Sequence, residues 1–188
     1  RDVAPSRGLG DVYKRQAYPK FVGGLSFSGD WKGIDLSFLF QAGLGRDVAL
    51  TGVYSGGIMD NTQMTKPFYH GGNSPKYLVE NSWREDNTNA EFPRLSIVQA
   101  SSNNAYSSTF WYRSGDYLRL KNLQIGYTFP QKWMSRIGID RLRIYFEGQN
   151  LWTVSELTKF NIDPEQPGVS NGYYPQQRIF SFGVNLAF

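Results

Sequence analysis

The 188-residue sequence contains no cysteine and a single histidine, His70. The absence of cysteine excludes a disulfide framework, a thiolate metal site and a cysteine nucleophile. One histidine cannot supply a metal site that needs two histidine ligands. No segment approaches 18 consecutive apolar residues, so a transmembrane helix is excluded as well. Thiol chemistry, clustered imidazoles and helical membrane spans therefore have no basis in this chain.

The chain also has only a small excess of basic over acidic residues. The formal net charge is +4, and residues 1–16, with four basic and two acidic side chains, supply +2 of it. The other 172 residues carry the remaining +2, and their Lys and Arg are scattered along the chain. Because nucleic-acid binding needs clustered positive charge, we expect no nucleic-acid partner.

No residue pattern indicates catalysis or a cofactor. Gly43-Leu44-Gly45 is isolated and opens a loop instead of a helix, so it is not a nucleotide-binding motif. His70 lies beside two glycines in an irregular region, where a lone histidine is far more often solvated than catalytic. Asp163 and Glu165 could ligate calcium, but a polar turn around Pro164 is the simpler interpretation. We expect no enzymatic activity, no cofactor and no metal site.

The sequence is rich in aromatic residues (16%) and glycine (20 residues). Apolar and polar residues alternate with period 2, which is typical of strands with two unlike faces. The alternating segments are residues 21–29, 34–41, 116–129, 141–151 and 180–188. The pattern predicts an all-β fold, an antiparallel meander of about five long strands.

The alternation divides the strand residues into two sets. The apolar set is Ile34, Leu36, Phe38, Phe40, Leu123, Ile125, Tyr127, Leu142, Ile144, Phe146, Phe180, Phe182, Val184 and Leu186. The polar set is Asp35, Gln41, Asn122, Gln124, Arg143, Tyr145, Glu147 and Gln149. In a β-sandwich the apolar face packs on a second sheet and the polar face meets water. In an outer-membrane barrel the apolar face meets lipid and the polar face lines the lumen.

Three features favour the barrel. The strands run about ten residues, the length that crosses a bilayer at a tilt. Short turns at 29–33 and 130–140 alternate with long connections at 43–115 and 152–177, as periplasmic turns and extracellular loops do in barrels. The polar set includes charged side chains, which suit a water-filled lumen, so its members are the lumen-lining candidates. Tryptophans stand at strand ends, where an aromatic girdle would lie: Trp31, Trp133 and Trp152.

The last strand ends at Phe188 and has apolar residues at every second position before it. Phe188, Leu186 and Val184 fit the signal that the outer-membrane insertion machinery reads. An ordinary terminal strand would show the same pattern, so both interpretations stay open.

Several longer stretches carry a more specific pattern. They are Tyr18–Gly24, Trp31–Gln41, Asn89–Leu95, Asp116–Tyr127, Leu142–Tyr145, Gly148–Leu151, Asp163–Glu165, Tyr174–Gln176 and Arg178–Asn185. In order, spacing and terminal position, the chain from about Ala17 to Phe188 resembles the C-terminal end of the SusC/RagA family of TonB-linked outer-membrane receptors.

The resemblance implies nutrient import across the outer membrane of a Gram-negative bacterium. Members of the family are large barrels with an N-terminal plug, are powered by TonB and pair with a SusD-like surface lipoprotein. Their substrates are oligosaccharides or peptides, and their barrels contact outer-membrane lipid. This sequence has no plug, no TonB-contacting segment and too few strands to close a barrel. We therefore expect the C-terminal part of a large transmembrane β-barrel; the alternative is a secreted carbohydrate-binding β-sandwich.

The resemblance also suggests a boundary within the chain. Residues 17–188 correspond to the C-terminal segment of the receptor barrel. Residues 1–16 match nothing in the family, which predicts either a foreign junction or a divergent extracellular loop.

Overall fold

The computed structural model of the chain describes residues 18–50, 75–95, 109–166 and 176–188. The chain divides into two compact units. One unit, the sheet unit, comprises residues 20–44, 117–155 and 175–188. The other, the loop unit, comprises residues 1–19, 45–116 and 156–174. In the described parts of the chain, no helix has the length and apolar character needed to cross a membrane.

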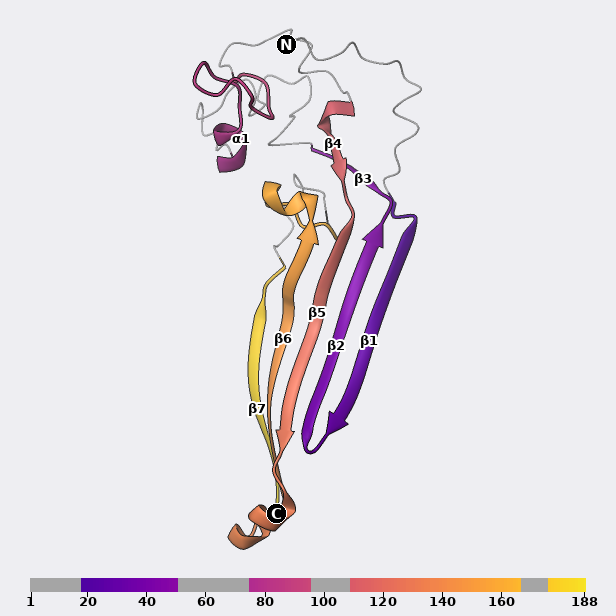
Figure 1. Cartoon of the computed structure of the whole chain (residues 1–188), viewed down its shortest axis with the longest axis vertical. Coiled ribbons are helices and arrows are strands. Elements are labelled where there is room, and N and C mark those ends of the chain that lie inside the picture. Colours follow the sequence, from indigo (N-terminus) through magenta and orange to yellow (C-terminus); the bar gives the residue numbers. More distant parts are fainter. Residues whose placement is uncertain (1–17, 51–74, 96–108, 167–175) are drawn as a thin grey trace. The chain divides into compact units, whose positions relative to one another are not determined.

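The sheet unit is one five-stranded antiparallel sheet (Figure 1). Its strands are β1 (Phe21–Trp31), β2 (Ile34–Leu44), β5 (Tyr117–Thr128), β6 (Arg141–Ser155) and β7 (Ile179–Ala187). They lie in the order β1-β2-β5-β6-β7, and each pairs with the next one in the sheet. The predicted all-β meander of about five long strands is therefore confirmed.

Two short connections join strands at the same end of the sheet. Between β1 and β2, Lys32 (φ 49°) and Gly33 (φ 87°) form a two-residue turn with positive φ at both positions, which matches the right-handed twist of the strands. Between β5 and β6 the chain forms one helical turn, α2 (Gln131–Met134), continued by the 3-10 helix η4 (Ser135–Ile137). Gly138 ends this helix in the left-handed conformation, φ 75°.

Strands β1, β2 and β6 are longer than the alternation predicts, and the pairing of β5 with β6 is irregular. The β5–β6 register shifts between Leu120 and Asn122, and the partners of these two residues on β6 are Trp152 and Gln149. Asn150 takes a positive φ of 52° at this point. The single extra residue, Lys121, changes the phase of the alternation along β5. β6 extends to Ser155, so the expected loop start at residue 152 was wrong.

The loop unit has a hydrophobic core of its own. Its elements are β3 (Asp47–Ala49), α1 (Lys76–Glu80), η3 (Thr109–Trp111), β4 (Tyr112–Ser114) and η5 (Glu156–Phe160). The core residues are Val48, Leu50, Leu78, Phe92, Trp111, Leu157, Phe160 and Ile162. They come from both long connections, so two segments that the sequence pattern indicates only as irregular loops fold around one core.

Candidate functional site

The register of the sheet gathers the whole predicted apolar set on one face. One row across the sheet shows this: Leu36 pairs with Ile125, Ile125 with Phe146, and Phe146 with Phe182. Because side chains alternate along each strand, residues at every second position join the same face. Rings of neighbouring strands pack together there: the centroids of Phe146 and Phe182 lie 5.1 Å apart.

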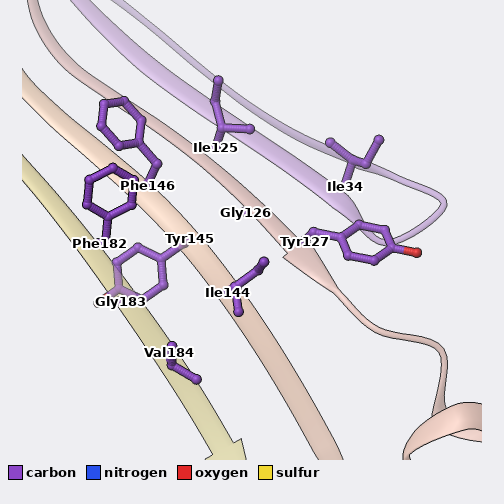
Figure 2. A pocket seen from close by; sticks show the side chains of 10 residues that line it. All are labelled: Ile34, Ile125, Gly126, Tyr127, Ile144, Tyr145, Phe146, Phe182, Gly183 and Val184. Atoms are coloured by element: carbon purple, nitrogen blue, oxygen red, sulfur yellow. The ribbon is translucent and has the colours of Figure 1, made fainter.

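This apolar face is open to the surroundings. Phe182 is 83% exposed, Val184 63% and Phe180 60%. Figure 2 shows a depression of about 650 Å³ on the sheet, around which apolar side chains of four strands stand. Its lining includes Ile34 on β2, Ile125 on β5 and Phe146 on β6. Soluble monomers rarely expose apolar surface on this scale, so the face is suited to contact with lipid or another apolar partner.

The height of the apolar face matches a membrane. Along β5 it extends from Leu118, which pairs with Val154, to Phe129, whose N–H donates to the Leu142 carbonyl. This is about ten strand steps once the bulged Lys121 is set aside, or roughly 33 Å along the strand. At a barrel tilt of about 40° the height becomes roughly 25 Å, the thickness of the apolar band of outer-membrane barrels.

All predicted lumen-lining candidates lie on the opposite face. They are Asp35, Gln41, Asn122, Gln124, Arg143, Tyr145, Glu147 and Gln149. Gln124 and Glu147 pair directly, and Ser37 and Ser181 continue their row on either side. The sheet therefore presents one polar and one apolar face. Its five strands form an open sheet, which does not enclose a lumen.

Two of the polar candidates bind each other across an intervening strand. Arg143 on β6 donates from Nε to Asp35 Oδ1 at 2.9 Å and from Nη2 to Oδ2 at 2.5 Å. The pair crosses β5 above Gly126, where a Cβ would lie 2.5 Å from Asp35 Oδ1. The Arg143 guanidinium also lies 4.8 Å from the Tyr145 ring, which covers Gly183 on β7. Arg143 therefore joins β6 to β2 across the intervening strand.

Other candidates form single hydrogen bonds. Gln149 donates to Glu147 Oε1 at 3.1 Å, and Gln41 donates to the Tyr117 hydroxyl at 3.1 Å. Arg119, which the sequence pattern missed, is only 3% exposed and donates to Thr153 at 2.9 Å. The signal was hidden because Arg119 lies beyond the bulge, where the alternation changes phase.

The proposed insertion-signal residues lie at the end of β7. Val184 and Leu186 are exposed on the apolar face, and Phe188, which follows the strand, is 86% exposed. Their recognition by insertion machinery stays a prediction.

A network of charges holds the loop unit together. Glu91 accepts hydrogen bonds from Tyr77 Oη at 2.8 Å, from Arg113 Nη2 at 3.0 Å and from Lys159 Nζ at 3.3 Å. Burial alone would raise the pKa of Glu91, but these hydrogen bonds and the charge of Lys159 hold it below its ordinary value. Burial, together with the nearby Glu91 carboxylate, raises the pKa of Tyr77. The network joins the first long connection to the second.

Glu165 N–H donates to Asp163 Oδ1 at 2.8 Å, which is the expected polar turn around Pro164. No group of three or more metal-ligating side chains occurs in the residues that the structure describes. His70 and residues 1–16 lie outside the described residues.

Known proteins resemble both the sequence and the fold. TonB-dependent receptor P3 of Formosa agariphila is 28% identical over 183 residues, which is 90% of this chain. TonB-dependent receptor SusC of Bacteroides thetaiotaomicron is 30% identical over 105 residues, which is 54% of this chain. The RagAB peptide importer in its closed-closed state superposes with a TM-score of 0.62, at 27% identity over 93% of this chain. In both sequence and fold, the chain resembles part of the SusC/RagA-type TonB-dependent receptors.

The chain is short beside these relatives. It spans 16% of the length of receptor P3, 10% of SusC and 18% of the matching RagAB chain. No protein-family model matches it. Its five-stranded meander corresponds to part of a transmembrane β-barrel of the receptor type.

Proposed function

We propose that this segment forms part of the wall of an outer-membrane, TonB-dependent active importer of nutrients in a Gram-negative bacterium. The apolar face of the sheet contacts lipid, and the polar face, with Gln124 and Glu147 at its centre, lines the path of the solute. The observation that carries this proposal is the two-faced sheet, whose exposed apolar side is about as tall as an outer-membrane apolar band. Residues 17–188 constitute the receptor part of the chain in this proposal.

The relatives suggest how the importer works. RagAB is a peptide importer, and SusC and receptor P3 are TonB-dependent receptors. By analogy, the whole protein takes up a peptide or an oligosaccharide, receives energy through TonB and works with a SusD-like surface lipoprotein. The proposal contains no catalytic step, because a transporter of this kind moves its substrate unchanged.

The β-sandwich alternative agrees less well with the structure. A carbohydrate-binding sandwich needs a second sheet packed on the apolar face. Phe182 and Val184 are instead mostly exposed, and the described residues of the sheet unit form a single sheet.

The test is uptake by cells that carry the complete receptor gene. A deletion strain, its complemented form and a strain lacking TonB are supplied with fluorescent peptides and oligosaccharides of defined length. We expect one of the two classes to accumulate only when both receptor and TonB are present. Co-purification of a lipoprotein with the tagged receptor would support the proposed partner. Equal uptake in all strains would contradict the proposal.

A further inference from the structure

Both short connections of the sheet present a tryptophan next to a lysine. Trp31 and Lys32 stand in the β1–β2 turn, and Lys132 and Trp133 stand in α2. Trp31 is 68% exposed and Trp133 is 55% exposed. Lys32 Nζ lies 4.6 Å from the centre of the Trp31 ring. Since the two connections lie at the same end of one sheet, their aromatic and basic side chains gather at one edge.

The helical connection between β5 and β6 exposes both apolar and basic side chains. Met134 is its only buried residue, whereas Trp133 and Ile137, four positions apart, are exposed, Ile137 to 65%. Lys132 and Arg136, also four positions apart, are exposed beside them. This short connection therefore exposes two apolar and two basic side chains within six residues. Exposed tryptophan and isoleucine beside lysine and arginine are the composition of segments that lie in a lipid–water interface.

The position of this edge fits such an interface. The apolar row that contains Ile34, Tyr127, Ile144 and Val184 lies next to the two connections. The hydrocarbon-facing surface therefore ends where the tryptophans and basic side chains begin. Lys32, Lys132, Arg136 and Arg141 exceed the nearby Asp30 and Asp140 by two positive charges, which complements an anionic surface.

We propose that this end of the sheet is an anchor for the head groups of anionic phospholipids. The ammonium groups of Lys32 and Lys132 and the guanidinium of Arg136 bind lipid phosphates, for which a guanidinium offers two parallel N–H donors. Trp31 and Trp133 lie at the level of the glycerol backbone, with Ile137 reaching the acyl chains. The inference rests on the proposed function, since it requires the sheet to span a membrane.

The test uses the complete receptor, purified in detergent and depleted of lipid. Native mass spectrometry then counts phosphatidylglycerol and phosphatidylcholine molecules retained by the wild type and by the double variant Lys132→Gln/Arg136→Gln. Each basic side chain near an anionic surface changes affinity by roughly fivefold, so we expect the double variant to lower phosphatidylglycerol affinity by about twenty-five-fold. Retention of phosphatidylcholine should stay the same.

The matched control removes two positive charges from the loop unit. Lys76 and Arg84 are exposed there and pair with Glu80 and Asp86. The variant Lys76→Gln/Arg84→Gln should retain phosphatidylglycerol like the wild type, and Lys132→Arg/Arg136→Lys should as well. Equal loss in the loop-unit control, or no loss in Lys132→Gln/Arg136→Gln, would overturn the anchor. Displacement of the lipid by millimolar inorganic phosphate or glycerol phosphate would also overturn it, because the site would then recognise the free anion.

A spin label at position 182 separates this inference from the proposed function. In the same receptor reconstituted in a bilayer, Phe182→Cys carrying a nitroxide should be accessible to oxygen dissolved in the lipid phase. If the label is in lipid and the basic variant retains phosphatidylglycerol, only the anchor fails. If the label is in water, the membrane-spanning role itself fails, and the anchor with it.

Discussion

Arg143 and Asp35 form a bidentate ion pair that joins β6 to β2 across the strand between them. The two contacts, 2.9 Å and 2.5 Å, pass above Gly126 of β5. A planar guanidinium matches a carboxylate in this geometry, so the pair specifies position as well as charge. It therefore fixes how three consecutive strands of the sheet lie relative to one another.

Gly126 should be essential for this contact. A Cβ there would lie 2.5 Å and 2.6 Å from the two Asp35 carboxylate oxygens and 2.7 Å from Arg143 Nη2. Gly126→Ala should therefore push the pair apart and lower the free energy of unfolding by about 1–3 kcal/mol. Urea unfolding of the complete receptor in lipid or detergent, followed by tryptophan fluorescence, measures this loss.

Gly24→Ala is the matched control on the same face. A Cβ at Gly24 would meet its nearest atom, the Phe40 carbonyl oxygen, at 3.4 Å, an ordinary contact. The stability of Gly24→Ala should stay close to that of the wild type. Equal losses in both variants would mean that any added methyl group disturbs the sheet and that the ion pair has no special role.

The assignment of the two faces predicts opposite responses to a charge. Phe182 and Ser181 are neighbours on β7 and point to opposite faces, and Ser181 pairs with Glu147. Phe182→Arg should cost roughly 2–4 kcal/mol if residue 182 lies near the bilayer midplane. Ser181→Arg should cost much less, because its guanidinium can reach water and Glu147. Unfolding of both variants in lipid vesicles tests this difference, and similar costs would refute the assignment.

The two faces were predictable because burial in a sheet has a period of 2 that the sequence displays directly. The pairing of Leu36, Ile125, Phe146 and Phe182 in one row follows once strand order and register are known. Arg119 escaped prediction because the register shift near Lys121 changes the phase of the alternation. A bulge is set by local backbone geometry, such as the positive φ of Asn150, and hydrophobic patterning does not encode it.

The loop unit was less predictable for a different reason. Its core joins Phe92 of one long connection to Phe160 of the other, with ring centroids 6.2 Å apart. These residues stand in segments without sustained periodicity, and three strands, β4, β5 and β6, separate them in the sequence. Such non-local packing leaves no short-range signal. Tyr77 also packs against this core.

Glu91 should control the stability of the loop unit. Glu91→Gln keeps the size of the side chain but removes the charge that Arg113 and Lys159 neutralise. Loss of hydrogen bonds to a charged acceptor should destabilise the unit by about 1–3 kcal/mol. Hydrogen exchange of peptides covering residues 75–95 and 156–166 in the complete receptor reports this change. Glu85→Gln, an exposed carboxylate of the same connection, is the control and should leave exchange unchanged.

Glu91 should also make the stability of the loop unit depend on pH. The pKa of folded Glu91 lies below its ordinary value of 4.5, so the unfolded segment binds a proton at higher pH than the folded one. The stabilisation is therefore complete above about pH 4.5 and is lost as the pH falls from there through the folded pKa. The protection factors of amides in the loop unit, which correct for the intrinsic pH dependence of exchange, should fall over this interval in the wild type and less so in Glu91→Gln. Identical pH profiles would show that another group is responsible.

The last prediction concerns which end of the sheet faces outward. Barrels have short periplasmic turns and long extracellular loops, so the loop unit should be outside the cell and the α2 turn in the periplasm. Asp86→Cys and Lys132→Cys place single thiols at exposed positions in these two regions of a chain that has no cysteine of its own. On intact cells a membrane-impermeant maleimide should label position 86 and spare position 132, and both should react after the outer membrane is permeabilised. Labelling of 132 in preference to 86 on intact cells would invert the topology and move the proposed phospholipid anchor to the outer leaflet.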